Sequence, residues 1–178
     1  MINFIRARAA GVLARKMGPE VTTATSPEVP DFAFEAGDRQ RTLTQMLETG
    51  PVLLVLFEPP APIERLQQLT TAQVPFSNVG LRIVAVGLAT PPEGASERRV
   101  APPCVVDVAS EVISTLTLFR AVEDGGETEL MLDRRANVRA RWTSAMNGGV
   151  PSPATLVATA QRVARIALAA PSHARHPH

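Results

Sequence analysis

The stretch that most constrains the fold of this chain runs from Pro51 to Arg65 and reads PVLLVLFEPPAPIER. Its six consecutive apolar residues, Val52 to Phe57, predict a strand that is buried on both faces. The prolines that follow end this strand, and apolar residues beyond them recur at the spacing of a helix that buries one face. The residues on that predicted face are Ile63, Leu66, Leu69 and Val74.

This order of strand, proline-rich turn and helix resembles the F-x-P-x-C-P-x-C segment of thioredoxin-like and redoxin proteins. In that fold a cysteine lies at the helix N-terminus, where backbone N–H groups and the helix dipole stabilise its thiolate. The four residues that stand where Cys-Pro-x-Cys would are Ala61, Pro62, Ile63 and Glu64. Both cysteine positions of the motif are therefore empty.

The resemblance continues toward both ends and covers about residues 29 to 169. The phrase VPDFAFEAGD is similar to the opening of redoxins and peroxiredoxins, and it predicts a short strand followed by a turn. Residues 42–48 match a helical turn of that family, and the apolar run 81–88 predicts a second core strand. We expect it to be parallel to the first strand, joined by a right-handed crossover.

The C-terminal half resembles the same family. Cys104 to Asp107 predicts another strand, and residues 108–119 a helix. Residues 129–133 and 137–142 predict two antiparallel strands around a turn, in which Asn137 replaces the usual glycine and supplies positive φ. A last helix, beginning at Ser152 or Pro153, is expected to cover one sheet face through Leu156, Ala160, Val163 and Ala167. The fold class implied is α/β, thioredoxin-like, with a central mixed sheet flanked by helices.

The N-terminal region is expected to be separate from this domain. Residues 1–17 have the pattern of a basic amphipathic helix, residues 18–28 read as an extended linker, and residues 170–178 as a disordered tail. A secretory signal is disfavoured because Arg6 and Arg8 interrupt its apolar core, which slightly favours a cytoplasmic location. A targeting presequence, contact with a membrane surface, docking to a partner and packing on the chain's own domain all stay open. The apolar residues proposed for such contact are Phe4, Ile5, Val12 and Leu13.

Charge is distributed unevenly along the chain. All seventeen acidic residues lie between Glu20 and Asp133, where there are only seven arginines, and seven arginines but no acid follow Asp133. The basic ends could fold onto the acidic body or could offer a surface to a partner. Nucleic acid is disfavoured as that partner, since the arginines are not interleaved with aromatic residues and no recognition motif accompanies them.

Thiol chemistry is limited to one residue. Cys104 is the only cysteine, which excludes an internal disulfide, a dithiol couple and a multi-cysteine zinc site. The threonine and cysteine of a peroxidatic site are missing, and Gly125-Gly126 lies where the family places a cis-proline before a strand. A buried structural role for Cys104 is preferred over a single-thiol reductant. The histidines His173, His176 and His178 lie in the tail, so we expect no selective metal site and no cofactor.

The preferred interpretation is a non-catalytic thioredoxin-like protein that binds another protein, as an accessory subunit or assembly factor. The alternatives are a single-thiol oxidoreductase using Cys104 and a cysteine-free peptide chaperone of the same fold. Beside the N-terminal residues, the candidate partner-binding residues are Pro59, Pro60, Pro62, Glu64, Arg65 and Trp142. For Trp142 the alternatives were an exposed interface anchor and a cover for the last helix.

Overall fold

The structure is a computed structural model that describes residues 27–36, 39–89, 105–120, 126–144 and 149–169. Within these ranges the elements are β1 (Ala33–Ala36), β2 (Arg39–Thr42), α1 (Leu43–Glu48), β3 (Val52–Phe57), α2 (Ile63–Thr71), α3 (Gln73–Asn78), β4 (Arg82–Gly87), β5 (Val105–Val108), α4 (Ser110–Thr117), β6 (Thr128–Leu132), β7 (Val138–Thr143) and α5 (Pro153–Ala169).

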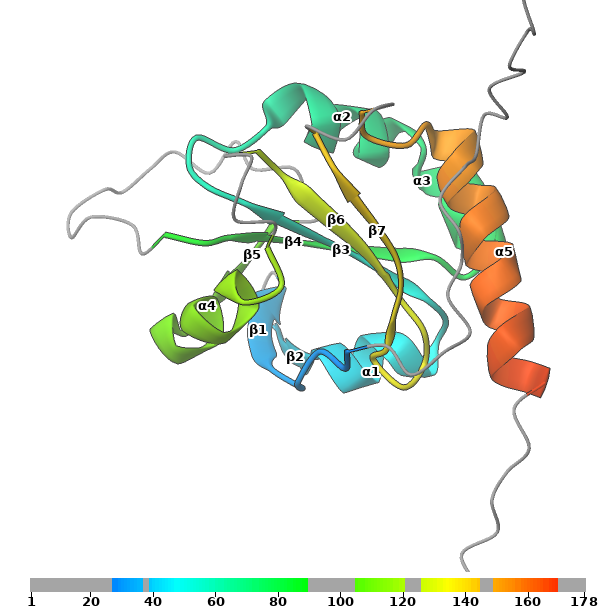
Figure 1. The fold of residues 1–178 in the computed structure, drawn as a ribbon, viewed down its shortest axis with the longest axis horizontal. Helices are drawn as coiled ribbons and strands as arrows, with labels where there is room; N and C mark the ends of the chain where they lie inside the picture. Colours follow the sequence, from blue (N-terminus) through cyan, green and yellow to red (C-terminus); the bar gives the residue numbers. More distant parts are fainter. Residues whose placement is uncertain (1–26, 37–38, 90–104, 121–125, 145–148, 170–178) are drawn as a thin grey trace, which may run out of the picture.

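The strands form one mixed sheet with the order β2-β1-β5-β4-β3-β6-β7 (Figure 1). Strands β3, β4 and β5 are parallel to one another, whereas β6 runs antiparallel to β3 and β7 antiparallel to β6. The predicted apolar strand therefore lies in the interior of the sheet, where Val52 is paired with Arg82 on one side and with Leu132 on the other.

Strand β3 is buried on both faces, as its continuous apolar sequence predicts. Leu53, Val55 and Phe57 belong to a core that also contains side chains of α2, α3 and α5. The alternate residues Val52, Leu54 and Leu56 belong to a second core with side chains of β1, α1 and α4. The sheet is thus covered by helices on both faces, α2, α3 and α5 on one and α1 and α4 on the other (Figure 1).

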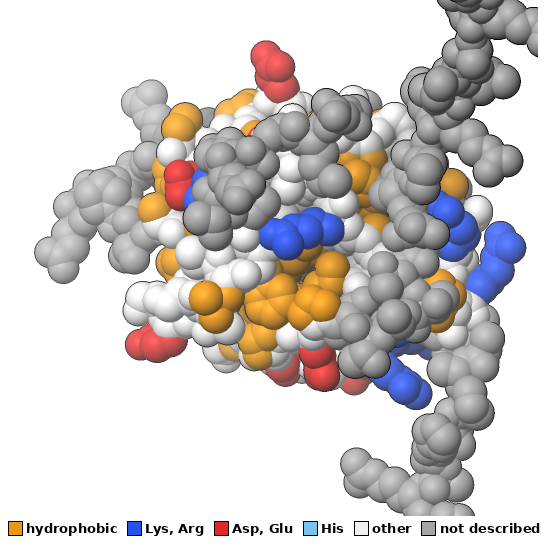
Figure 2. Space-filling view, viewed as in Figure 1, with side chains coloured by type: hydrophobic (Ala, Val, Ile, Leu, Met, Phe, Trp, Pro, Cys, Tyr) orange, Lys and Arg blue, Asp and Glu red, His pale blue; other side chains and the backbone are white. Residues whose placement is uncertain are grey.

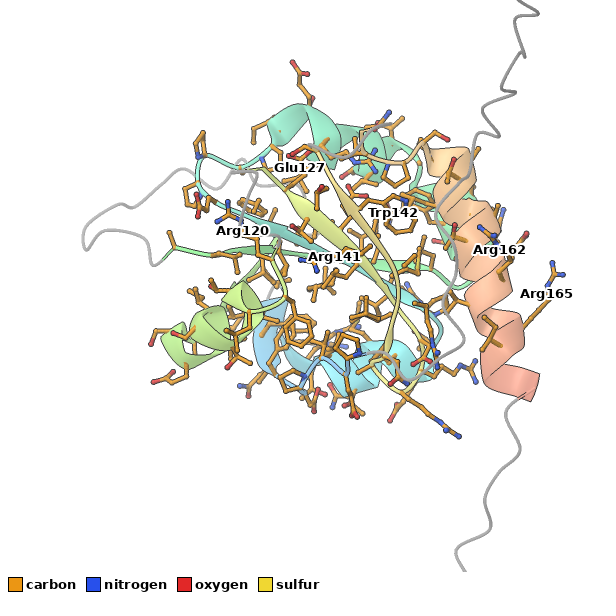
Figure 3. The ribbon with its side chains drawn as sticks, in the orientation of Figure 1. Arg120, Glu127, Arg141, Trp142, Arg162 and Arg165 are labelled. Carbon is orange, nitrogen blue, oxygen red and sulfur yellow. The ribbon has the colours of Figure 1, made fainter. Side chains whose placement is uncertain are left out.

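Most predicted elements are confirmed, and local hydrogen bonds explain their ends. Helix α1 begins after Thr42, whose side chain accepts a hydrogen bond from the Gln45 N–H at 3.2 Å while the Gln45 side chain accepts one from the Thr42 N–H at 3.1 Å. Helix α5 begins at Pro153 and buries Leu156, Ala160 and Val163. Its arginines Arg162 and Arg165 are exposed, as predicted (Figure 3).

Two predictions about the helix after β3 are wrong. Ile63 is 45% exposed and Val74 is 72% exposed, although Leu66 and Leu69 are buried as expected. The helical period is interrupted at Ala72, where α2 ends and α3 begins, so Val74 does not continue the buried stripe of α2. Ile63 lies in the first turn of α2, at the edge of the core.

The turn between β6 and β7 is formed differently from the prediction. Its positive-φ residue is Ala136, with φ of 59°, and not Asn137. Asn137 instead donates its backbone N–H to the Asp133 carboxylate at 3.1 Å, and its side-chain amide also contacts that carboxylate. The buried Asp133 holds this turn from inside, which lets alanine take the left-handed position.

Close backbone contact occurs between the residues that precede β3 and β4. An added Cβ at Gly50 would lie 2.2 Å from the carbonyl oxygen of Gly80. Gly80 itself has φ of 70°. The two strand entries can therefore approach this closely only because Gly50 has no side chain.

The last two residues of the predicted linker contact the domain. Pro27 and Glu28 lie against the β6–β7 turn, where Val138 N–H donates to the Pro27 carbonyl at 3.0 Å and Glu28 forms a bridge with Asn137. The predicted N-terminal helix, the rest of the linker, the predicted tail and Cys104 lie outside the described residues. Of the helices that are described, none has the length and apolarity needed to cross a bilayer.

Charge on the described surface follows the unevenness of the sequence. Figure 2 shows several arginine side chains toward the α5 side of the molecule, while acidic side chains stand over α2 and beside α4. The arginines of the C-terminal third that are exposed include Arg134, Arg135 and Arg141, besides the two on α5. The surface around α2 and the surface around α5 are therefore of different electrostatic character.

Candidate functional site

The candidate site lies where β3 ends and α2 begins. Between them runs the loop Glu58 to Pro62, in which the Pro59–Pro60 peptide bond is cis. Pro59 and Pro60 are exposed, and Ala61 and Pro62 are half-buried. Helix α2 has no side-chain cap at Pro62, and the Ile63 N–H donates to the Ala61 carbonyl at 2.8 Å. The backbone thus has the strand, turn and helix that the sequence predicts, with Ala61 in the loop before the helix.

Below the first turn of α2, Arg65 forms a buried ion pair with Glu129 of β6. Arg65 Nε donates to Oε1 of Glu129 at 2.6 Å, and Arg65 Nη2 donates to Oε2 at 2.9 Å. Nη2 also donates to the Pro151 carbonyl at 2.8 Å, and Nη1 donates to the Gln68 side chain. The guanidinium therefore joins α2, β6 and the segment that leads into α5, with bidentate geometry that favours a strong pair.

Glu129 is fully buried, and its environment changes its protonation equilibrium. Burial raises the pKa of the Glu129 carboxyl above its ordinary value of 4.5, because loss of water disfavours the charged form. The hydrogen bonds and the positive charge of Arg65 lower this pKa, and the nearby negative charge of Glu127 raises it. Glu129 therefore needs the positive charge of Arg65 to remain ionised in the interior.

A surface hollow of about 610 Å³ lies beside this ion pair, and we call it the α2 hollow. It is lined by Pro62, Ile63, Glu64, Arg65, Gln68, Glu127 and Val150. Its walls come from the first turns of α2, from the residue before β6 and from the segment before α5. Figure 3 shows Glu127 next to α2, at the start of β6. The α2 hollow therefore brings together three parts of the chain that are far apart in sequence.

The loop before α2 is also tied to the other face of the sheet. Arg120, which follows α4, forms an ion pair with Glu58. Arg141 of β7 donates to the carbonyl of Phe119 at 2.9 Å, next to Arg120 (Figure 3). These contacts fix the end of β3 relative to the end of α4.

Of the candidate residues that are described, two are not presented at the surface. Arg65 is 6% exposed and is occupied by Glu129, and Trp142 is 5% exposed. Trp142 packs in the same core as Leu156, Ala160 and Val163, so it covers the last helix and is not an exposed anchor. Its indole N–H is buried and has no hydrogen-bond partner among the described residues. Pro59, Pro60 and Glu64 are exposed and Pro62 is half-buried; Phe4, Ile5, Val12 and Leu13 lie outside the described residues.

Three participants were not identified from the sequence. Glu129 is an acid inside an otherwise apolar strand, ELML, and that pattern could have indicated a paired buried charge. The spacing of Ile63 fits the buried helical stripe, so the sequence does not indicate its exposure. Glu127 and its position beside α2 depend on the antiparallel pairing of β6 with β3, which no local pattern gives.

The described part of the site carries acids, an arginine, an amide and apolar groups. Within the described ranges no group of histidine, cysteine and acidic residues has the arrangement of a metal site. The single cysteine and the three histidines of the sequence all lie outside those ranges. The described residues can therefore bind through shape and charge, and they supply no thiol or imidazole for group transfer.

Comparison with known proteins identifies the fold. No protein-family model matches the sequence, and no curated protein matches it. Solved structures do match. A thiol:disulfide interchange protein from a Bacteroides species has a TM-score of 0.56 at 15% identity, over 87% of this chain and 98% of that one. The peroxidoxin BcpB from Mycobacterium tuberculosis has a TM-score of 0.52 at 17% identity, over 79% of this chain and 96% of that one.

A third match is BsSco, described as a member of the Sco family of cytochrome c oxidase assembly proteins, with a TM-score of 0.53 at 10% identity over 79% of this chain and 95% of that one. All three likenesses span nearly the whole of the other protein and most of this chain. The sheet order, the helices on both faces and the position of the proline-rich loop agree with what the sequence resemblance implies. The chain therefore has the thioredoxin-like fold of redoxins, and its single cysteine, Cys104, is consistent with the absence of the family's active-site cysteines.

Proposed function

We propose that this protein is a non-catalytic member of the thioredoxin-like fold that binds another protein through the α2 hollow, as an accessory subunit or assembly factor. The observation that carries the proposal is Ile63, a large aliphatic side chain left 45% exposed at the helix N-terminus and lining a surface hollow. A side chain of this kind costs free energy when it faces water, and a partner that covers it recovers that free energy.

Two further observations support a binding role over thiol chemistry. The positions of the motif thiols hold Ala61 and Glu64, and neither can act as a sulfur nucleophile. The walls of the hollow are also held together, because the Arg65–Glu129 pair connects α2 to β6 and Arg65 connects α2 to the segment before α5. Rigid surroundings reduce the entropy cost of binding. One of the proteins of similar fold, BsSco, is a member of the Sco family of cytochrome c oxidase assembly proteins.

The test compares two matched substitutions in the tagged full-length chain, Ile63→Glu and Val74→Glu. Val74 is an aliphatic residue with still greater exposure, it lies on the neighbouring α3, and it is not among the residues that line the α2 hollow. Affinity capture from the cells that naturally make the protein should recover a stoichiometric partner with the unchanged chain and with Val74→Glu. Ile63→Glu should lose that partner by tenfold or more, since the new carboxylate would have to be desolvated in the interface.

Thermal unfolding of both variants is the control, and both should melt close to the unchanged chain because both sites are exposed. Equal capture by the two variants would show that the α2 hollow is not the binding surface. Disulfide reductase turnover that survives the change Cys104→Ser would contradict the non-catalytic assignment.

A further inference from the structure

We infer that the α2 hollow selects a basic and apolar segment of its protein partner, one in which an aliphatic side chain is flanked by lysine or arginine. This inference rests on the proposed function, since it names the chemistry of the partner for the same site.

The apolar part of the recognition comes from three residues of the lining. Pro62, Ile63 and Val150 line it, and none of the three is fully buried. A volume of about 610 Å³ is sufficient for an aliphatic side chain together with the backbone around it. A neutral polar segment would leave these side chains without an apolar partner.

The charged half comes from two carboxylates on the walls. Glu64 is exposed and Glu127 is half-buried, and neither forms an ion pair among the described residues. They lie on different elements, Glu64 in the first turn of α2 and Glu127 before β6. A segment bound in the hollow would therefore be near two carboxylates that come from different elements.

The cation of the hollow does not cancel this negative charge. Arg65 is 6% exposed, and its guanidinium is already bonded to both oxygens of Glu129. The Arg65–Glu129 pair is neutral as a unit, so the charge presented by the lining is that of Glu64 and Glu127. A cationic group of a ligand would complement it, whereas a phosphate, an acidic peptide or an anionic lipid headgroup would be repelled.

A cation beside Glu127 would also affect the electrostatics of the buried Glu129. Its negative charge lies close enough to the buried Glu129 to oppose ionisation of that residue. A lysine or arginine placed beside Glu127 would reduce this repulsion. The hollow and the interior charge pair are thus linked electrostatically.

The experiment measures binding of three labelled peptides to the full-length chain by fluorescence anisotropy at low and at physiological salt. The peptides have equal length and differ only in the cores Lys-Leu-Lys, Ser-Leu-Ser and Glu-Leu-Glu. We expect the lysine peptide to bind about fivefold more tightly than the serine peptide at low salt, since each exposed charge pair contributes a modest factor. This preference should shrink at physiological salt, where charges are screened beyond about 8 Å.

Charge changes at matched positions show whether the preference for the lysine peptide arises from Glu64 and Glu127. In the double variant Glu64→Lys/Glu127→Lys the preference should reverse toward the glutamate peptide. The control Glu48→Lys/Glu111→Lys changes the net charge equally at exposed positions of α1 and α4, and it should keep the preference for lysine. Ile63→Glu should weaken binding of the serine peptide.

The outcomes separate the inference from the proposed function. Binding of all three peptides with equal affinity, lost in Ile63→Glu, would retain the hollow as a binding site and overturn its selection of basic segments. A lysine preference that falls equally in both double variants would show attraction by net charge alone, and would also overturn the inference. If none of the peptides binds, the inference is wrong, and the capture comparison of Ile63→Glu with Val74→Glu decides separately whether the hollow is the binding surface.

Discussion

At the scale of single residues, a buried ion pair lies below the first turn of α2. The carboxylate of Glu129 on β6 accepts hydrogen bonds from the Arg65 guanidinium on α2 at both of its oxygens. A buried pair of this type is costly to break, because removal of one partner leaves the other charged and without water. The same pair can be replaced by apolar residues at much lower cost.

This contrast predicts the outcome of a mutant cycle. Arg65→Met or Glu129→Leu alone should each lower the free energy of unfolding by about 3–5 kcal/mol, since each leaves an uncompensated buried charge. The double variant Arg65→Met/Glu129→Leu should be more stable than either single variant. Urea denaturation of the four proteins measures this, and a double variant with the summed loss of the two single ones would show that the pair is not coupled.

The raised pKa of Glu129 predicts how the stability difference between the unchanged chain and the double apolar variant changes with pH. Because the pKa of Glu129 is raised above 4.5 in the folded chain, folding favours the protonated form, and the resulting stability is present at pH values below 4.5. It is lost as the pH rises through the raised pKa. The stability of the unchanged chain minus that of the double apolar variant should therefore fall as the pH rises from 4.5. Urea denaturation at a series of pH values checks this, and a difference that increases with pH would contradict the direction.

The burial and backbone conformation of a residue could be predicted from the sequence where they depend on local spacing. They could not be predicted where they depend on contacts across the fold. Leu66 and Leu69 could be assigned to the core from spacing alone, and the buried face of α5 could be as well. The left-handed position at Ala136 could not be predicted, because it is stabilised by the side chain of Asp133 and not by its own preference. Ile63 is exposed and lines a hollow together with Glu127 and Val150, which are distant in sequence, so its spacing in the helix did not predict its exposure.

At the scale of elements, the sheet depends on the close approach of the chain at the entries to β3 and β4. Gly50→Ala would place a Cβ 2.2 Å from the Gly80 carbonyl oxygen, so one of the two central strands would have to shift. We expect this change to lower the free energy of unfolding by at least about 3 kcal/mol.

Gly149→Ala is the matched control for that substitution. Gly149 also has positive φ, of 63°, but an added Cβ there would meet nothing within 4 Å. Its cost should be only about 1 kcal/mol, from the left-handed backbone alone. Equal losses of stability for the two variants, measured by urea denaturation, would show that backbone strain and not the contact with Gly80 is what matters.

Most of the elements were predictable because they have sequence signals of their own, whereas β2 and the separate helix α3 were not predicted. The apolar run of β3, the family-like helical turn over residues 42–48 and the apolar stripe of α5 all coincide with observed elements. The break between α2 and α3 and the attachment of Pro27 and Glu28 to the β6–β7 turn had no such signal. Both depend on neighbouring elements that are distant in sequence.

At the scale of the whole molecule, we expect the basic N-terminal segment, residues 1–17, to contribute little to the stability of the domain. Burial of Ile5, Val12 and Leu13 could contribute on the order of 5 kcal/mol to a contact before entropy costs. A proline-containing linker that extends by about 3.1 Å per residue could place that contact away from the domain.

Deletion of residues 2–17 should therefore leave the melting transition nearly unchanged and should reduce association with the partner. Scanning calorimetry and affinity capture of the same protein measure the two effects. A large fall in the melting temperature would show that the segment packs on the domain.

The central position of β3 also determines when the sheet can be completed during synthesis. Its parallel partner β4 follows it closely in the chain, but about fifty more residues separate Arg82 from Leu132, the partner of Val52 on the other side, and a ribosome adds about 5–20 residues per second. For several seconds the most apolar strand of a growing chain therefore has one edge without its native neighbour. The nascent protein is most exposed to mispairing in this interval, before β6 has been made.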